Sequence, residues 1–408
     1  MLVAALGLAA CSSDDDGIVD ETVLDTTTTT LSPRVVGDGR LVIGALLPLS
    51  DAVIGEPAVA AVELAVDRVN AAGGVLDRSV GLVVADEGST AATASNSIQT
   101  LISRGADVIV GPASSLITLS VLDDIVDAGK VACSPTASAM SLDGFPDEGL
   151  FFRTIPSDSL QAAAIAGAAD QTGAQRVTIV HVDDSYGRPF AAAVEDSLQS
   201  EAIDVVDQIA FAASDDDLSG EARELARSDT QVVIVLADGD NGTRFLEALD
   251  DVDTSGLSTI VVNDAFRNPA APQRIEGLGA ELRSKIVGLA PHATSGDPAN
   301  PYDPPGPYAV NAFDCVNLIA LAAVRAGSDA PLDIAGQLAQ VSVSGSACNT
   351  FVSCVETIES GLQIDYNGPS GVTDLQPRTG DPSQAIFDRF VFDDSGRDVL
   401  QRTEIIGS

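Results

Sequence analysis

From residue 40 onward, the sequence alternates between short apolar runs that predict β-strands and longer periodic runs that predict helices. The first strand is expected at 41–49 ("LVIGALLPL"), and further strands are expected at 81–86, 106–111 and 130–134. Between the first two strands lies "EPAVAAVELAVDRVNAAGG", in which valines recur at helical spacing before a glycine stop. Strands that alternate with helices of this length form a largely parallel sheet with helices on both faces. The pattern therefore predicts an α/β fold.

The alternation restarts after "FFRTIPS" (151–157), which indicates a second α/β unit of similar size. Further strands are expected at 176–182, 205–211, 231–237 and 258–264, with helices at about 158–172, 187–200, 219–228 and 241–250. A third section begins near 286–291 and contains a long apolar helix at 307–327. Two units followed by a returning segment predict two lobes with several crossings between them.

The charge balance argues against two classes of partner. The 408 residues, enough for two domains, include 60 Asp and Glu against 21 Lys and Arg, a formal net charge of -39. Such a surface repels nucleic acid and anionic lipid. We therefore expect no nucleic-acid partner.

The first residues predict export. An apolar run ends in Leu8-Ala9-Ala10-Cys11, which resembles the lipobox of bacterial lipoproteins, where the cysteine is lipidated. The run is too short to span a bilayer; the alternatives are an ordinary secretory segment or a buried helix. We expect a signal segment at 1–11, lipidation of Cys11, a flexible tether at 12–39, and a lipid-anchored protein on the extracytoplasmic side of the cell membrane.

Two neighbouring strands are each followed by a loop of small hydroxyl residues. The strand at 106–111 leads into Gly111-Pro112-Ala113-Ser114-Ser115, and the strand at 130–134 leads into Ser134-Pro135-Thr136-Ala137-Ser138. Ligands of open parallel sheets bind beyond the carboxyl ends of the strands, where helix N-termini present unpaired N–H groups. These groups and the hydroxyls can hold a carboxylate without a buried cation. The alternative for any one serine is a plain helix N-cap.

Over about 40–408, the chain resembles the type I periplasmic solute-binding proteins, specifically the branched-chain amino-acid binding group of ABC importers. The resemblance rests on the order and spacing of "IGALLPLSDAVIGEPAVAAVELAVDRVNAAGG", "VGPASS", "CSPTAS", "FFRTIPSD", "VDDSYGRPFA", "CNTFVSC" and "IDYNGPSG". It implies a two-lobed fold, each lobe a parallel sheet flanked by helices, with three crossings near 154–158, 288–292 and 356–364. Lobe 1 is expected at 40–155 plus 291–357, and lobe 2 at 156–290 plus 358–408.

The same resemblance implies a ligand site in the cleft between the lobes. Ser115 matches the serine that holds the ligand's α-carboxylate, and Asp264 matches the carboxylate that accepts its ammonium; the alternative for Asp264 is a solvated turn. Tyr186 matches a cleft-facing tyrosine, although ordinary packing between the lobes would also explain it. The expected ligand-binding set is Ala113, Ser114, Ser115, Thr136, Ser138, Tyr186, Asp238 and Asp264.

Two loops depart from the family pattern. Asp238 and Asp240 stand where relatives often carry tyrosines, and Ile54 stands where an aromatic residue is common. These departures bear on which ligand side chain is accepted, and they point to a more polar or acid-repelling pocket.

The function implied by the resemblance is that of a substrate-binding protein of an ABC importer, a monomer that takes a small amino acid or related carboxylate and meets membrane permease subunits. The alternative is a ligand-sensing receptor or regulator that uses the same cleft. An enzyme is the third choice, because His181 lies inside an apolar strand, His292 lies in a Pro-rich connection, and no G-x-S-x-G elbow is present. We expect no cofactor. We also expect no metal, because "DVDTSG" (251–256) begins like a calcium-binding loop but has Val262, not glutamate, at the twelfth position.

The cysteines predict one disulfide. Cys348 and Cys354 bracket the short loop "CNTFVSC", relatives carry a similar pair, and an exported chain meets oxidising conditions. Cys133 and Cys315 lie in apolar segments, so we expect them to be free and buried.

Overall fold

The computed structural model describes residues 36–237, 239–267, 271–292, 306–371 and 374–407. The expected signal segment, Cys11 and the tether up to residue 35 lie outside this part of the chain, as does Asp238. The described elements all belong to the compact unit Arg34–Ser408.

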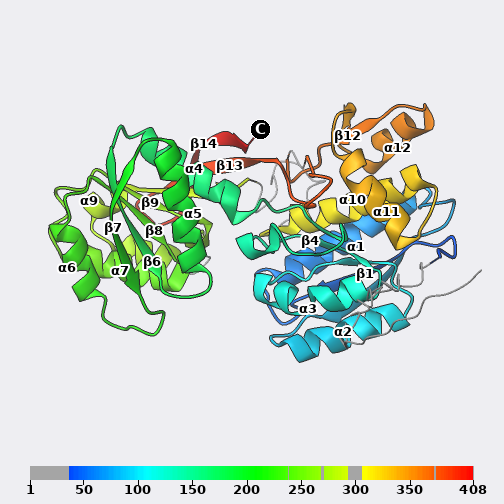
Figure 1. The fold of residues 1–408 in the computed structure, drawn as a ribbon, viewed down its shortest axis with the longest axis horizontal. Coiled ribbons are helices and arrows are strands. Elements are labelled where there is room, and N and C mark those ends of the chain that lie inside the picture. The colour runs from blue at the N-terminus through cyan, green and yellow to red at the C-terminus, as the bar shows by residue number, and fades with distance from the viewer. Residues whose placement is uncertain (1–35, 238, 268–270, 293–305, 372–373, 408) are drawn as a thin grey trace, which may run out of the picture. The chain divides into compact units, whose positions relative to one another are not determined.

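The first sheet contains five parallel strands in the order β2-β1-β3-β4-β5. These are β1 (Val42–Leu47), β2 (Gly81–Asp86), β3 (Val108–Val110), β4 (Val131–Ser134) and β5 (Phe151–Arg153). Its helices are α1 (Gly55–Ala71), α2 (Ala91–Ser103) and α3 (Ser115–Asp127), joined by α10 (Ala309–Ala326), α11 (Pro331–Leu338) and α12 (Phe351–Glu359) from much later in the chain. Apolar side chains of β1 alternate in direction, so that one face packs under α1 and α10 and the other under α2 and α3. The late helix α10 thus lies beside α1 (Figure 1).

The second sheet has seven strands in the order β14-β13-β10-β9-β8-β6-β7. Five are parallel: β6 (Arg176–Val182), β7 (Asp204–Phe211), β8 (Val232–Leu236), β9 (Thr259–Val262) and β10 (Ile286–Pro291). Its helices are α4 (Asp158–Asp170), α5 (Gly187–Ser200), α6 (Ser219–Arg227), α7 (Gly239–Asp250), α8 (Ala271–Gly277) and α9 (Ala280–Ser284). One face packs under α4 and α5, and the other under α6 to α9. The predicted α/β class and its largely parallel sheets are confirmed.

An antiparallel hairpin extends the second sheet and was not predicted. It is formed by β13 (Gln384–Phe392) and β14 (Asp398–Gly407), and β13 pairs antiparallel with β10. The hairpin escaped the sequence analysis because it lies beyond the last β-α repeat, where the period of the pattern changes.

The packing places the last crossing between the sheets later than expected. The short parallel pair β11 (Ser346–Cys348) and β12 (Ile364–Tyr366) lies with the first sheet, because Ile364, Tyr366 and Leu375 belong to its core. Because these residues pack with the first sheet, we propose that lobe 1 extends to about Leu375 rather than 357.

The described residues also form three short 3-10 helices: η1 (Met140–Leu142), η2 (Asp264–Phe266) and η3 (Ala339–Val341).

Helix α10 is the one described helix that is long and apolar enough to cross a membrane, yet it is largely buried inside the protein. Its buried carboxylate, Asp314, accepts hydrogen bonds from the Tyr366 hydroxyl at 2.6 Å and from the Ser370 backbone N–H at 2.8 Å. A buried charge that is matched in this way ties the helix to the "YNGPSG" loop. We conclude that α10 is a core helix.

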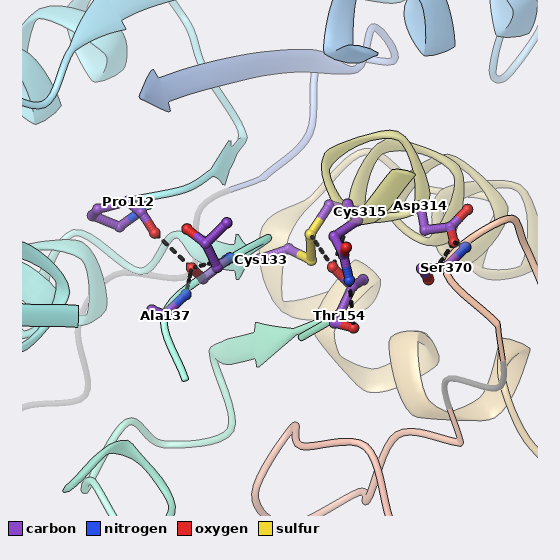
Figure 2. Close-up of a disulfide and its surroundings, with 10 residues drawn as sticks. Pro112, Cys133, Ala137, Thr154, Asp314, Cys315 and Ser370 are labelled. Atoms are coloured by element: carbon purple, nitrogen blue, oxygen red, sulfur yellow. Dashed lines mark hydrogen bonds between the residues drawn. A yellow bond between two sulfur atoms is a disulfide. The ribbon is translucent and has the colours of Figure 1, made fainter. Parts of the chain in front are cut away.

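The described residues include two disulfides, one predicted and one not. The expected Cys348–Cys354 bond is confirmed. Cys133 and Cys315 are buried as expected, but the prediction that they are free is wrong: they form a second disulfide that joins β4 to α10, with Cα atoms 5.7 Å apart (Figure 2). Their apolar surroundings made them look like ordinary core residues, and their sequence separation of 182 concealed the contact.

Candidate functional site

The order of the first sheet determines where a ligand can enter it. From β1 the chain passes through α1 to β2 on one side, and from β3 it passes through α3 to β4 on the other. Beyond the carboxyl ends of two such strands the loops diverge and leave a crevice, which is where open α/β sheets bind ligands. The crevice lies between the segment 48–54 and the segment 111–115.

A cavity of about 280 Å³ occupies this crevice. It is lined by Pro48, Asp51, Ile54, Glu87, Ala113, Ser114, Ser115, Thr136 and Tyr308. Four of the predicted ligand-binding residues are on this lining: Ala113, Ser114, Ser115 and Thr136. The serine loop after β3 and the threonine of the loop after β4 are therefore brought together.

The two loops hold each other through their hydroxyl groups. Ser114 is the N-cap of α3 and accepts a hydrogen bond from the Ile117 N–H, so this serine takes the plain capping role. Ser115 accepts a hydrogen bond at its Oγ from the Ala139 N–H at 3.3 Å, and Thr136 donates from its Oγ1 to the Ala113 carbonyl at 2.7 Å. Because Ser115 stands in the first turn of α3, its own N–H has no helical partner and lies at the positive end of the helix dipole.

Glu87 lines the cavity, and the sequence analysis missed it. Its carboxylate accepts the Ala113 N–H at 2.6 Å and the Ser114 N–H at 3.2 Å, and the residue is only 2% exposed. Burial raises the pKa of Glu87 to about 6, against the lowering effect of the two N–H groups. The available signal was its position directly after β2, at the same edge of the sheet as the serine loops.

Asp264 does not line the cavity, but it is hydrogen bonded to a residue that does. Its carboxylate accepts the Tyr308 hydroxyl at 3.2 Å and the Gln161 Nε2 at 3.0 Å. Tyr308 has a left-handed backbone, with φ of 56°, which is uncommon for a residue other than glycine. Burial raises the pKa of Asp264.

A second carboxyl group, that of Asp158, lies near Asp264, and the sequence analysis did not predict it as a site residue. Asp158 is 4% exposed, and its backbone N–H donates to the Ser138 carbonyl at 2.9 Å. Burial, followed by the charge of Asp264, raises the pKa of Asp158 to about 7, against a hydrogen bond from the Ser138 side chain. The predicted residue Ser138 therefore faces Asp158. A cation that binds beside the pair would take the place of a proton, because two adjacent carboxylates disfavour full ionisation.

Tyr186 lies beside this pair and not on the cavity lining. Its hydroxyl accepts the Asn263 Nδ2 at 3.1 Å, and its ring packs at 5.6 Å from the ring of Phe190. Burial raises the pKa of the Tyr186 hydroxyl well above its usual value, and the charges of Asp158 and Asp264 add to this effect. Tyr186 therefore belongs to the acidic side of the site.

Arg153, at the end of β5, joins the loop after β4 to Asp381, which lies shortly before β13. The guanidinium is completely buried; its Nε lies 2.6 Å from an Asp381 oxygen, and its Nη2 donates to Asp143. Its Nη1 donates to the carbonyls of Ala137 and Ala139, each at 3.2 Å. The loop that carries Thr136 and Ser138 is thereby attached to a rigid planar group.

The arrangement suits the binding of a small molecule of mixed charge. One side presents hydroxyls and a helix N-terminus, and the other presents carboxyls; no Lys or Arg of the described residues lines the cavity. His181 bonds within its own strand through Nδ1, His292 contacts Asp388 at 2.6 Å, and neither is on the cavity lining. Within the described residues, no group of three or more His, Cys, Asp or Glu side chains is placed to hold a metal ion.

Comparison with known proteins gives a consistent picture. A family model described as "Periplasmic binding protein" matches residues 41–354. The chain is 28% identical to the chemotactic signal transduction system substrate-binding protein BasB of Halobacterium salinarum, over 85% of this chain and 87% of BasB. It is 24% identical to Leu/Ile/Val-binding protein homolog 3 of Brucella melitensis, over 81% and 89% of the two chains.

Solved structures share the fold. The substrate-binding protein LivJ from Streptococcus pneumoniae in complex with isoleucine matches with a TM-score of 0.67 and 20% identity, over 90% of this chain and 100% of LivJ. An ABC transporter substrate-binding protein from Desulfitobacterium hafniense in complex with Leu matches with a TM-score of 0.68 and 21% identity, over 88% and 99%. These neighbours are binding proteins and not enzymes.

Proposed function

Because this chain belongs to the periplasmic binding protein family, as a type I protein of the branched-chain amino-acid group, we propose that it binds a small amino acid or related carboxylate at the crevice of the first sheet. The observation that carries this proposal is the cavity at the N-terminus of α3, where Tyr308 lines the same cavity as the serine loops and donates its hydroxyl to Asp264. Such a site offers hydrogen-bond donors to a carboxylate and acceptors to an ammonium group.

The proposed pose assigns each charged group of the ligand to one side. The hydroxyl and N–H of Ser115, with Thr136 beside them, hold the carboxylate, while the N–H groups of Ala113 and Ser114 stay with Glu87. Asp264, with Asp158 beside it, accepts the ammonium, while Tyr186 and Ser138 support these carboxyls. Asp238 stays a predicted contact outside the described residues. The two lobes would close on the ligand by hinge motion at the crossings between the sheets.

Replacing Asp264 with alanine is expected to raise the Kd for the best-bound amino acid at least about 30-fold, because a desolvated ammonium loses its charge partner at a cost of roughly 2–5 kcal/mol. Replacing Ser115 with alanine is expected to raise the Kd only about tenfold, since helix N–H groups remain. Titration calorimetry with a panel of amino acids measures both effects. Glu224→Ala, which removes an exposed carboxylate of α6, is the matched control. If Asp264→Ala binds as tightly as the parent, the ligand has no ammonium at that place.

Two uses of the bound ligand are to be distinguished. We propose delivery to the permease subunits of an ABC importer, as expected from the sequence. The similarity to BasB favours a second use, in which the loaded protein signals to a chemotaxis receptor. Deleting the protein should abolish uptake of the labelled ligand if it serves an importer; loss of chemotaxis with uptake intact would favour the sensor.

We also propose that Cys11 carries a lipid anchor on the extracytoplasmic side, in line with the exported nature of this family. The Cys11→Ala variant is expected to lose the lipid and to move from the membrane fraction to the soluble fraction, because no hydrophobic chain then holds it at the bilayer. Fractionation followed by mass spectrometry of the N-terminal peptide measures both changes. A Cys11→Ala protein that stays on the membrane without lipid would contradict the anchor.

A further inference from the structure

We propose that the preferred ligand is an amino acid with a cationic side chain; this inference rests on the proposed function and names the ligand class of the same site. If Ser115 and Thr136 receive the carboxylate and Asp264 the ammonium, the rest of the cavity is lined by Pro48, Asp51, Ile54 and Glu87. The ligand side chain must therefore lie against two carboxylates and two apolar residues.

Asp51 has acceptor capacity to spare. One carboxylate oxygen, Oδ1, accepts the N–H groups of Val53 at 2.7 Å and of Ile54 at 3.0 Å, which fixes the orientation of the group. Among the described residues, the other oxygen accepts no hydrogen bond, although a carboxylate offers about four acceptor sites. An N–H donor of the ligand could bind to this second oxygen of Asp51.

Glu87 adds a second negative charge on the same part of the lining. Its two oxygens each take one backbone N–H, so that its position is fixed and half of its acceptor capacity remains. Asp86 and Asp51 lie close enough for their charges to act on it. No basic residue of the described lining balances these groups, so a cation of the ligand is the complement they lack.

The two apolar residues fit the remainder of such a side chain. Lys-like and Arg-like side chains have a methylene stem and a charged head, and the stem packs on apolar surface while the head seeks polar partners. Pro48 and Ile54 supply that surface beside Asp51. A cavity of about 280 Å³ admits a single small metabolite rather than a peptide. An acidic side chain would instead be repelled by both carboxylates.

The test compares ligands that share a stem and differ in the head. Titration calorimetry of the purified full chain with L-lysine, L-norleucine and L-glutamate separates the cationic head from the aliphatic stem and the reversed charge. We expect lysine to bind at least about tenfold more tightly than norleucine, and glutamate to bind least. Asp51→Asn keeps an acceptor oxygen for both of its backbone N–H groups, whereas Glu87→Gln keeps an acceptor oxygen for only one of its two. In each variant the lysine-to-norleucine ratio should fall several-fold. Glu224→Ala should leave the ratio unchanged.

The possible outcomes test separately the ligand class, the role of the two carboxylates and the proposed function. If wild-type protein binds norleucine as tightly as lysine, this inference is wrong, while the proposed amino-acid function stands. If lysine is preferred but neither Asp51→Asn nor Glu87→Gln alters the ratio, the assignment of the head to these carboxylates is wrong. If none of the three ligands nor any other amino acid binds, the proposed function itself fails. Thermal melting of both variants identifies a fold defect, and either folded variant alone suffices for the comparison.

Discussion

Replacing Cys133 and Cys315 together with alanine is expected to lower the free energy of unfolding by about 5 kcal/mol. The bond closes a loop over a sequence separation of 182, and the loop-entropy estimate for a ring of this size is of that order. Both cysteines are fully buried, so the loss of two sulfur atoms from the core adds to the destabilisation.

Equilibrium unfolding in urea measures this loss, and the other disulfide is the matched control. Cys348 and Cys354 are 6 residues apart, so their alanine double variant is expected to lose only about 2.4 kcal/mol. Equal losses in the two double variants would contradict the argument from loop length. Alkylation of Cys133 or Cys315 in the unreduced, unfolded protein would show that the bond is not formed.

Replacing Arg153 with methionine is expected to cost about 3–5 kcal/mol of stability and to weaken ligand binding as well. The change leaves Asp381, which is 5% exposed, without its charge partner. It also removes the donors that hold the carbonyls of Ala137 and Ala139, so the loop that carries Thr136 is released.

Urea unfolding and calorimetry on the same samples separate the two effects of Arg153→Met. Combining it with Asp381→Asn should recover part of the stability, because the orphaned charge is gone, but should not restore the affinity, because the loop stays released. Arg153→Lys should resemble the methionine variant in affinity, since an ammonium cannot reproduce the planar set of contacts. A stability loss below about 1 kcal/mol in Arg153→Met would show that the contacts of Arg153 contribute little to folding stability.

The parts of the fold that repeat were predictable from the sequence. The β-α alternation, the two parallel sheets and the Cys348–Cys354 bond follow from periodicity, spacing and resemblance. The position of Ser115 at the start of α3 follows in the same way, because a strand, a loop and a helix are contiguous in the sequence. The ligand role of Ser115 stays a prediction.

What escaped prediction depends on contacts between distant segments. The Cys133–Cys315 bond required knowing that α10 packs over β4, and nothing local in either segment indicates this. Asp158 was overlooked because, in a chain with 60 acidic residues, a single acidic residue has no distinguishing pattern until burial sets it apart, whereas Glu87 was overlooked although it directly follows β2. Arg153 was visible only as part of "FFRTIPSD", since its partner Asp381 lies 228 positions away.

The Cys133–Cys315 bond closes a covalent ring over a sequence separation of 182, nearly half of the 408-residue chain. The segment between the two cysteines contains β5 and the five parallel strands of the second sheet, β6 to β10. A single protease cut anywhere within that segment would therefore leave the two fragments linked through sulfur. On a non-reducing gel, such a nicked chain would migrate as one species, and reduction would separate its two fragments. One cut in this segment would therefore not separate β1 to β4 from the second sheet.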